Sequence, residues 1–354
     1  MDTMTPGSRD ELIDILKAAT TDRQCLLPVG GRTHLDRGNP ARIDAEVSTR
    51  RIGSVMAYDP AELVATVEAG MTCGELDAIL AGYNQEWPVD AATSATIGGV
   101  VAAGVSSPRR LRVGPVRDWI LGVEFVTGDG RLIRGGGRTV KNVSGYDLPR
   151  LLTGSLGTLG IIASVDLRLR PRSLARRTIR ARGGVEQAAT AAAALPMAYG
   201  ALATSDSIEL RLEGWPEDVD DQSRQAAALL EDAVVEDGGA FPLHRPWLHE
   251  AVTVEVAVAP SNLIELTRAL RAPWGALAGV GIVWVGLPSA DEPLEELRRQ
   301  VTALGGIAPV IKGPGGLGPG GPRPGSEAWA IQQRIKAAFD PRGVLAPGRF
   351  WGEA

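Results

Sequence analysis

Apolar positions along the chain of 354 residues recur at helical and then at strand spacing, beginning with a well-marked helix. Ser8 and Glu11 form a capping-box pattern, because a serine accepts a bond from the third residue of a helix while a glutamate there bonds back. An apolar stripe over 12–19 continues this helix. A short apolar run over 25–29 then predicts a buried strand, which ends at two glycines. The expected order is helix, strand, glycine turn.

The next 140 residues repeat this alternation with more glycine. The predicted elements are a strand over 63–69, a helix over 72–80 opened by a Thr72–Glu75 capping box, a run of small residues over 96–104, strands over 119–126 and 131–134, and a strand over 161–169. Asp129-Gly130 between two apolar runs is a strong hairpin signal. Pro171 and the arginines after it indicate a domain boundary.

Beyond residue 175 the character of the chain changes, and helical and extended patterns alternate. Helices are expected over 186–195, 219–234, 262–271 and 294–304, and strands over 208–212, 252–258 and 279–285. This alternation predicts an α+β sheet covered by helices. Residues 313–325 are rich in Gly and Pro and predict a surface loop, after which Ser326 caps a last helix to residue 339. The domains are expected at 1–172, 173–325 and 326–354, the last returning to the first.

Composition narrows the class of protein. The net charge of −5 gives no support for a nucleic-acid surface, and most arginines are expected on solvated faces. Two distant cysteines, Cys25 and Cys73, predict neither a disulfide framework nor a zinc or iron–sulfur site. The chain lacks both a stretch of ~18 apolar residues and a signal-peptide pattern, so a cytoplasmic protein without a membrane span is expected.

The first glycine turn, residues 28–34, has the composition of a phosphate-binding loop. Gly30 and Gly31 allow main-chain N–H groups to converge on an anion, and the Thr33 hydroxyl adds a donor. Arg32 and His34 complete the turn. An ordinary strand-to-strand turn has the same composition, so both interpretations stay open.

The run Thr96-Ile97-Gly98-Gly99, followed by small residues to Gly104, is more specific. Adjacent glycines before a helix of tiny side chains let a flat ligand approach the backbone. Tight helix packing requires the same residues, and the two explanations are compatible.

Two later segments are further candidates. Residues 154–162 offer main-chain contacts to a ring system and a ribose, or form a strand-entry turn. Residues 141–147 could reach a cofactor or a partner, or start a helix capped by Asp147. The Rossmann spelling at Gly313, Gly315 and Gly318 is rejected, because it lies among prolines without a following helix. The three histidines, His34, His244 and His249, lack metal-ligand spacing.

In this order the motifs resemble the FAD-binding domain of the vanillyl-alcohol-oxidase/PCMH flavoprotein superfamily. The resemblance covers about residues 8–171, includes Gly114-Pro115-Val116-Arg117-Asp118 and the hairpin, and extends to a closing signature over 339–349. It implies that Gly30–His34 and Thr96–Gly99 hold the pyrophosphate of FAD and that Gly157–Ile162 follow the ribose and ring. The cofactor-binding residues expected from it are Val29, Gly30, Gly31, Arg32, Thr33, His34, Thr96, Ile97, Gly98, Gly99, Gly104, Arg117, Asp118, Gly154, Gly157, Thr158, Gly160, Ile161 and Ile162.

Within the superfamily, residues 102–118 and 141–148 are similar to the FAD-binding second subunits of bacterial glycolate oxidase complexes. This similarity implies an FAD domain followed by a smaller cap domain, working beside a catalytic FAD-linked subunit and an iron–sulfur subunit. Peripheral attachment to the inner membrane would then come through those partners. Arg32 stands where covalent members often carry a flavin-linking histidine, so non-covalent FAD is expected. Leu156 and Ala346 replace an acidic residue and an asparagine of the family pattern.

An absence in the second half bears on catalysis. Catalytic 2-hydroxy-acid dehydrogenases of the superfamily carry a histidine-rich metal and base motif there, whereas residues 250–354 contain no histidine. Removing a hydroxyl proton needs a base of suitable pKa, commonly histidine. We therefore expect an accessory or electron-relaying FAD subunit, with no catalytic residue or metal ligand assigned. The alternatives are a free-standing FAD-dependent oxidoreductase and a scaffold subunit that has lost its flavin.

Overall fold

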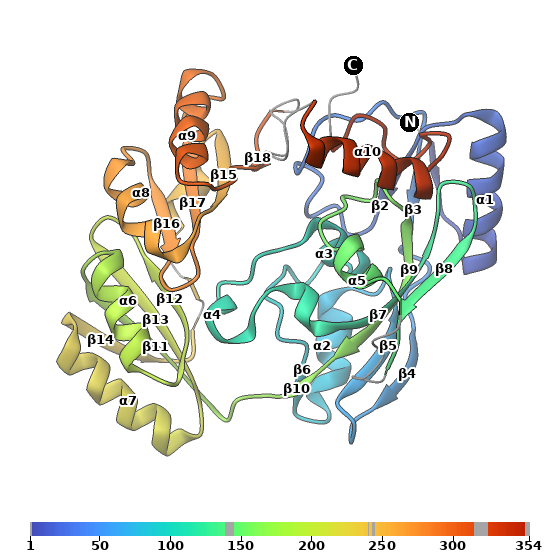
Figure 1. The fold of residues 1–354 in the computed structure, drawn as a ribbon. Coiled ribbons are helices and arrows are strands. Elements are labelled where there is room, and N and C mark those ends of the chain that lie inside the picture. The colour runs from blue at the N-terminus through green and yellow to red at the C-terminus, as the bar shows by residue number, and fades with distance from the viewer. Residues whose placement is uncertain (1, 139–144, 240, 243–244, 315–324, 351–354) are drawn as a thin grey trace. The chain divides into compact units, whose positions relative to one another are not determined.

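The chain folds into two compact units (Figure 1). The structure, a computed structural model, describes residues 2–138, 145–239, 241–242, 245–314 and 325–350. The first unit comprises Met1–Val105, Pro115–Arg172 and Pro322–Ala354, and the second comprises Ser106–Gly114 and Ser173–Gly321. Each mixes helices with sheets, in agreement with the α+β fold class expected from the sequence. The candidate motif over 141–147 and the rejected glycine spelling at 313–318 lie largely outside the described residues.

A three-stranded parallel sheet, in the order β1-β3-β2, opens the first unit. Its elements are β1 (Asp2–Met4), α1 (Arg9–Asp22), β2 (Leu26–Val29) and β3 (Ala45–Ser48). Ser8 caps α1 by accepting a bond from the Glu11 amide at 3.2 Å, and Leu12 and Leu16 are fully buried against the sheet. Leu345 forms a parallel bridge beside Leu26, so the segment after α10 (Glu327–Phe339) extends this sheet.

A five-stranded antiparallel sheet, in the order β4-β5-β9-β7-β8, and a two-stranded antiparallel sheet, β10-β6, lie in the rest of this unit. The elements of this part are β4 (Val55–Asp59), β5 (Val64–Glu68), α2 (Cys73–Ala81), β6 (Gln85–Glu86), α3 (Ile97–Ala103), η1 (Val116–Trp119), β7 (Ile120–Val126), β8 (Leu132–Gly136), α5 (Leu148–Leu152), β9 (Ile161–Arg168) and β10 (Arg170–Pro171). The predicted hairpin is confirmed as β7–β8, and Thr72 and Glu75 form the predicted capping box at α2. Phe125 of β7 is fully buried at the centre of the core.

The second unit is built on one eight-stranded antiparallel sheet, in the order β14-β11-β13-β12-β16-β17-β15-β18. Its elements are α4 (Arg110–Val113), β11 (Ala175–Arg182), α6 (Val185–Ala194), β12 (Ala198–Ala203), β13 (Ser207–Gly214), α7 (Pro216–Leu229), β14 (Glu231–Asp237), η2 (Pro246–His249), β15 (Val252–Ala257), η3 (Pro260–Asn262), α8 (Leu263–Ala269), β16 (Trp274–Leu277), β17 (Ile282–Leu287), α9 (Glu292–Ala303) and β18 (Val310–Lys312). Helices α6 to α9 pack on one face of the sheet (Figure 1).

One local prediction in this unit was wrong. The helix expected over 219–234 ends at Leu229, and the following residues form the edge strand β14. The division between the two units falls at Arg172 and Ser173, and the arginines that follow it lie on β11, the partner strand of β14. Arg177 lies 2.8 Å from Asp237, and Arg180 also pairs with Glu236, so cross-strand ion pairs link the two strands.

Residues 106–114, which the sequence analysis placed with the FAD-binding region, belong to the second unit. Arg109 lies 3.2 Å from the Glu213 carboxylate on β13, and the side chains are 10% and 1% exposed. Arg112 Nε donates to the carbonyl of Ala198 on β12 at 3.2 Å. Most arginines of the chain were expected on solvated faces, but Arg109 is buried because a carboxylate of the sheet compensates its charge.

Candidate functional site

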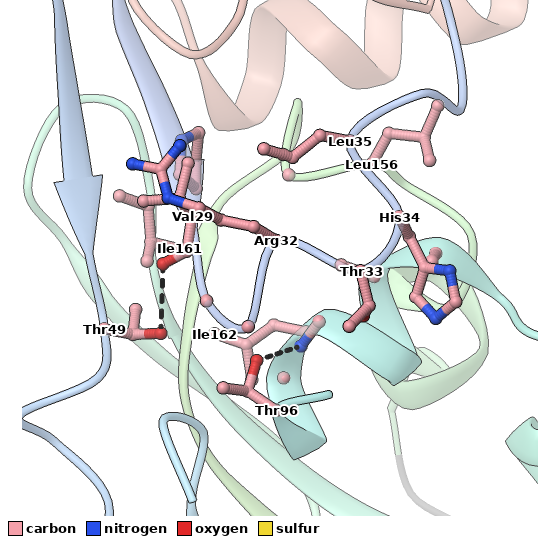
Figure 2. A pocket seen from close by; sticks show the side chains of 18 of the residues that line it. Val29, Arg32, Thr33, His34, Leu35, Thr49, Thr96, Leu156, Ile161 and Ile162 are labelled. Carbon is pink, nitrogen blue, oxygen red and sulfur yellow. Dashed lines mark hydrogen bonds between the residues drawn. The ribbon is translucent and has the colours of Figure 1, made fainter. Parts of the chain in front are cut away.

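A cavity lies in the first unit, where three glycine-rich turns meet (Figure 2). The turn after β2, the start of α3 and the turn into β9 form its walls. These turns are separated by more than fifty residues along the chain. The predicted cofactor residues that the structure brings together here are Val29, Gly30, Gly31, Arg32, Thr33, His34, Thr96, Gly98, Gly99, Gly157, Gly160, Ile161 and Ile162.

Two glycines let the first turn approach the second. A Cβ on Gly30 would lie 2.1 Å from Oγ1 of Thr96, and a Cβ on Gly31 would lie 2.1 Å from the carbonyl oxygen of Ser94. Neither distance is possible for real atoms, so any larger residue would force the two turns apart. These glycines are therefore needed to form the wall of the cavity itself.

At the start of α3 the two glycines serve different purposes. A Cβ on Gly98 would lie 2.7 Å from the Cβ of Ala69, so this glycine allows tight packing. A Cβ on Gly99 would meet only Thr96 Oγ1, at 2.9 Å, and is otherwise open. The Thr96 side chain accepts a bond from the Gly99 amide at 3.2 Å and fixes the turn. Both explanations of this motif, packing and ligand access, thus apply at neighbouring positions.

The Arg32 side chain is held by Glu46. Its Nη1 donates to Glu46 Oε1 at 2.9 Å, and its Nη2 bonds the other oxygen, to which Thr3 also donates. The Arg32 guanidinium lowers the pKa of the Glu46 carboxyl, and the carboxylate raises the pKa of Arg32. The positive charge of Arg32 at the cavity is therefore balanced by a carboxylate of the chain itself.

The remaining predicted residues lie elsewhere in the first unit. Ile97 is fully buried in the core. Gly104 ends α3 with a positive φ of 61°, and its Cβ would lie 3.1 Å from Cα of Gly154. Gly154 and Thr158 line a neighbouring cavity under α10. Arg117 and Asp118 lie 3.8 Å apart on η1, 41% and 54% exposed, and are absent from the cavity wall.

Some wall residues were absent from the expected cofactor-binding residues. Leu35 and Thr49 lie outside the predicted motifs, whereas other wall residues lie within them, namely Pro28, Ala102, Ala103, Leu156 and Arg349. Thr49 donates to the carbonyl of Val29 at 3.4 Å and steadies the turn. Leu156 adopts a positive φ of 54°, within the segment where an acidic residue was expected. Arg349 belongs to the closing signature, which was the available signal, but its distance in sequence concealed its place in the wall.

Known proteins are similar to this chain in sequence. Residues 3–136 match the family model of an FAD binding domain. The chain is also 29% identical over 358 residues to the glycolate oxidase subunit GlcE of Escherichia coli (strain K12), with 97% of each chain covered. The chain is a flavoprotein with an FAD-binding domain. It is an FAD-dependent oxidoreductase.

Further comparisons agree with this assignment. The flavoprotein is 28% identical over 321 residues to the glycolate oxidase subunit GlcD of Bacillus subtilis (strain 168), covering 86% of this chain and 67% of the relative. A solved structure of alkyldihydroxyacetonephosphate synthase matches with a TM-score of 0.69 at 15% identity, covering 98% of this chain and 75% of that one. This likeness concerns the fold.

The residues of the cavity fit FAD. Gly99 leaves the backbone of the second turn open to the cavity, and a buried cation, Arg349, lies in the wall. An anionic diphosphate needs a close approach to the backbone and such a charge. Among the described residues, no group of three or more His, Cys, Asp and Glu side chains is arranged to hold a metal ion. None of the described helices combines the length and apolarity needed to cross a bilayer.

Proposed function

We propose that this flavoprotein is the FAD-binding accessory or electron-relaying subunit of a glycolate (D-2-hydroxy acid) oxidase or dehydrogenase complex. It would work beside a catalytic FAD-linked subunit and an iron–sulfur subunit, in the cytoplasm or at the inner membrane through these partners. The observation that carries the proposal is the similarity to subunit GlcE over 97% of both chains.

In this proposal the glycine turns hold FAD without a covalent bond. Main-chain N–H groups of 30–34 bind the pyrophosphate, the open backbone at Gly99 lets it approach α3, and 157–162 follow the ribose and ring. The amides of Ile97, Gly98 and Gly99 donate within the chain, so the segment 96–99 contributes close approach to the ligand. FAD supplies two-electron and one-electron chemistry, whereas the chain binds, orients and shields it. The Glu46 carboxylate holds Arg32, which stands where covalent relatives carry histidine. His34 remains the alternative position for a covalent link.

The second unit supports an accessory role. On the sheet face away from α6–α9, the Glu213 carboxylate is 1% exposed and ion-paired with Arg109. Trp247 and Trp284 stack with centroids 5.7 Å apart, and Trp284 Nε1 donates to Glu255 at 3.1 Å. These side chains are engaged in packing. The histidine-rich segment of catalytic relatives has no counterpart in the sequence of residues 250–354.

The main rival is a free-standing FAD-dependent oxidoreductase for another hydroxylated substrate. The two proposals differ in what the purified chain does alone. A subunit should hold flavin that is reduced slowly, or not at all, by glycolate and other D-2-hydroxy acids until its partners are added. Rapid anaerobic bleaching of the flavin by a hydroxylated compound, with the chain alone, would support the rival.

Co-purification from the native source tests the complex directly. A tagged chain should bring down a second FAD-linked polypeptide and an iron–sulfur polypeptide, with flavin and iron both present. A matched bait, in which Arg109→Met removes an interaction inside the second unit, reports whether recovery depends on that unit being intact. Recovery of the chain alone, with bound flavin and independent turnover, would contradict the proposal. A colourless chain recovered with the partners would favour a scaffold role.

A further inference from the structure

Arg349 is a buried cation in the wall of the FAD cavity. The residue is 7% exposed, although its guanidinium carries a permanent charge. Burial lowers the pKa of its guanidinium, which shows that the surroundings disfavour the charge. Buried arginines are normally compensated by a carboxylate or by several acceptors.

The described residues compensate this charge only in part. Arg349 Nη2 donates to the carbonyl of Leu35 at 2.8 Å, and this is its side-chain hydrogen bond among the described residues. The guanidinium has five N–H groups, so most of them are left for another acceptor. Asp36 acts on it at longer range, and no carboxylate of the described residues forms an ion pair with it. Arg32, the other arginine of the described wall, is paired with Glu46.

The backbone at Arg349 is fixed on two sides. Its carbonyl accepts a bond from the Asn39 amide at 2.7 Å, and its amide donates to the carbonyl of Ala346 at 3.1 Å. Gly38, with a positive φ of 84°, packs so closely that a Cβ there would lie 3.3 Å from Cγ of Arg349. The side chain is thus directed into the wall before any ligand arrives, which lowers the entropic cost of using it.

We infer that the guanidinium of Arg349 binds the diphosphate of FAD, and that the segment 340–349 therefore completes a cofactor site otherwise built from residues 28–162. The inference rests on the proposed placement of FAD in this cavity. A planar fork of N–H donors matches two oxygens of a diphosphate, and the anion supplies the negative charge that the described residues do not place beside Arg349.

Affinities of apoprotein variants for FAD and for ADP test this role, because both ligands carry the diphosphate and ADP lacks the flavin. Arg349→Met should weaken both by about 10- to 100-fold, the range for losing charge-assisted bonds in a buried site. Arg349→Lys keeps the charge without the fork and should fall between. Arg342→Met is the matched control, because Arg342 is exposed in the same segment, and should change neither affinity by more than about 2-fold.

Riboflavin, which has no phosphate, separates anion binding from a merely structural role, and thermal unfolding of each apoprotein checks the fold. If Arg349 only anchors Leu35, the Arg349→Met variant should lose affinity for riboflavin and for FAD by the same factor, or unfold at a lower temperature while it still binds ADP. Either result, or FAD binding at the wild-type level, overturns the inference. Wild-type apoprotein that binds neither FAD nor ADP would instead refute the proposed FAD site.

Discussion

Gly30 packs directly against the side chain of Thr96: a Cβ added to Gly30 would lie 2.1 Å from Oγ1 of Thr96. The two residues begin separate glycine motifs, one after β2 and one at α3. Thr96 also binds the Gly99 amide, so displacing its hydroxyl would disturb the turn that faces the cavity. The contact therefore couples the two motifs mechanically.

Gly30→Ala should lower both stability and FAD content. Overpacking of this kind costs about 1–3 kcal/mol, and the flavin-to-protein ratio should fall several-fold because the two turns separate. Thr96→Ala in the same chain removes Oγ1 and should restore part of the flavin content. Gly82→Ala is the control, because a Cβ there would meet its nearest atom at 3.5 Å. Urea unfolding and flavin absorbance measure both effects; equal flavin content in Gly30→Ala and the wild type would contradict the expectation.

Many helices and strands of the first unit could be predicted from the sequence because the residues that start and end them lie close together along the chain. Capping residues such as Thr72 and Glu75, and Asp129-Gly130 in the hairpin, act within a few positions. The signals of the second unit are long-range. Arg177 of β11 resembles a solvated residue until Asp237 of β14 is placed beside it. No pattern within either segment reveals that pairing.

The candidate site shows the same division. The glycine turns could be recognised from their composition, but composition does not distinguish Gly98, which packs on Ala69, from Gly99, which is open. Arg349 reaches the cavity wall because the nearby Leu345 pairs in parallel with Leu26. The register of that pairing cannot be derived from the sequence. Arg117, by contrast, belongs to a motif that lies on the surface of η1.

Substitutions at Arg117 and Asp118 should leave FAD binding unchanged. Their mutual distance of 3.8 Å and their exposure make the pair weak, and they do not line the cavity. Arg117→Met and Asp118→Asn should each alter the FAD dissociation constant by less than about 2-fold. Fluorescence titration of the apoproteins measures this. A loss of ten-fold or more would return both residues to the cofactor site.

Glu75 should stabilise the protein in a pH-dependent manner. The amide of Thr72 donates to its carboxylate at 2.7 Å, and with the Thr72 hydroxyl and Arg50 it lowers the pKa of Glu75 to about 2. Because the folded pKa lies below the unfolded value of ~4.3, the contribution is complete above ~4.3 and is lost as the pH falls towards 2.

Glu75→Gln should therefore lower the free energy of unfolding by about 0.5–1 kcal/mol at pH 7, a modest effect because the side chain is half exposed. The difference between the two proteins should shrink between pH 4 and pH 3. Urea unfolding at each pH measures it, and a difference that grows on acidification would show that another group dominates.

Cys73 should be unreactive in the folded protein. Burial raises the pKa of its thiol to about 12, so the thiolate is scarce at pH 8. Alkylation by iodoacetamide should proceed more than about 100-fold slower than for a free thiol with pKa ~8.5. In urea the same residue should react at the ordinary rate. A mass-spectrometric time course distinguishes the two states, and rapid labelling of native Cys73 would show that α2 opens readily.

The side chain of Lys336, on the last helix, binds segments that lie next to the candidate site. Its ammonium lies 2.6 Å from Oδ2 of Asp340 and donates to the carbonyls of Thr158 and Leu345, each at 2.8 Å. Asp340 is fully buried and accepts bonds from the amides of Val344 and Leu345. The pair therefore holds the segment that leads to Arg349.

Lys336→Met should destabilise the protein by about 1–3 kcal/mol, since it leaves a buried carboxylate without its cation. Flavin retention should fall as well, because the segment carrying Arg349 loosens. Asp340→Asn added to Lys336→Met removes the uncompensated charge, so the double variant should lose less than the two single losses combined. Exposed Lys17→Met provides the control for removing a lysine. Thermal unfolding with and without FAD measures these losses of stability. Losses that add up in the double variant would mean that the two side chains act independently.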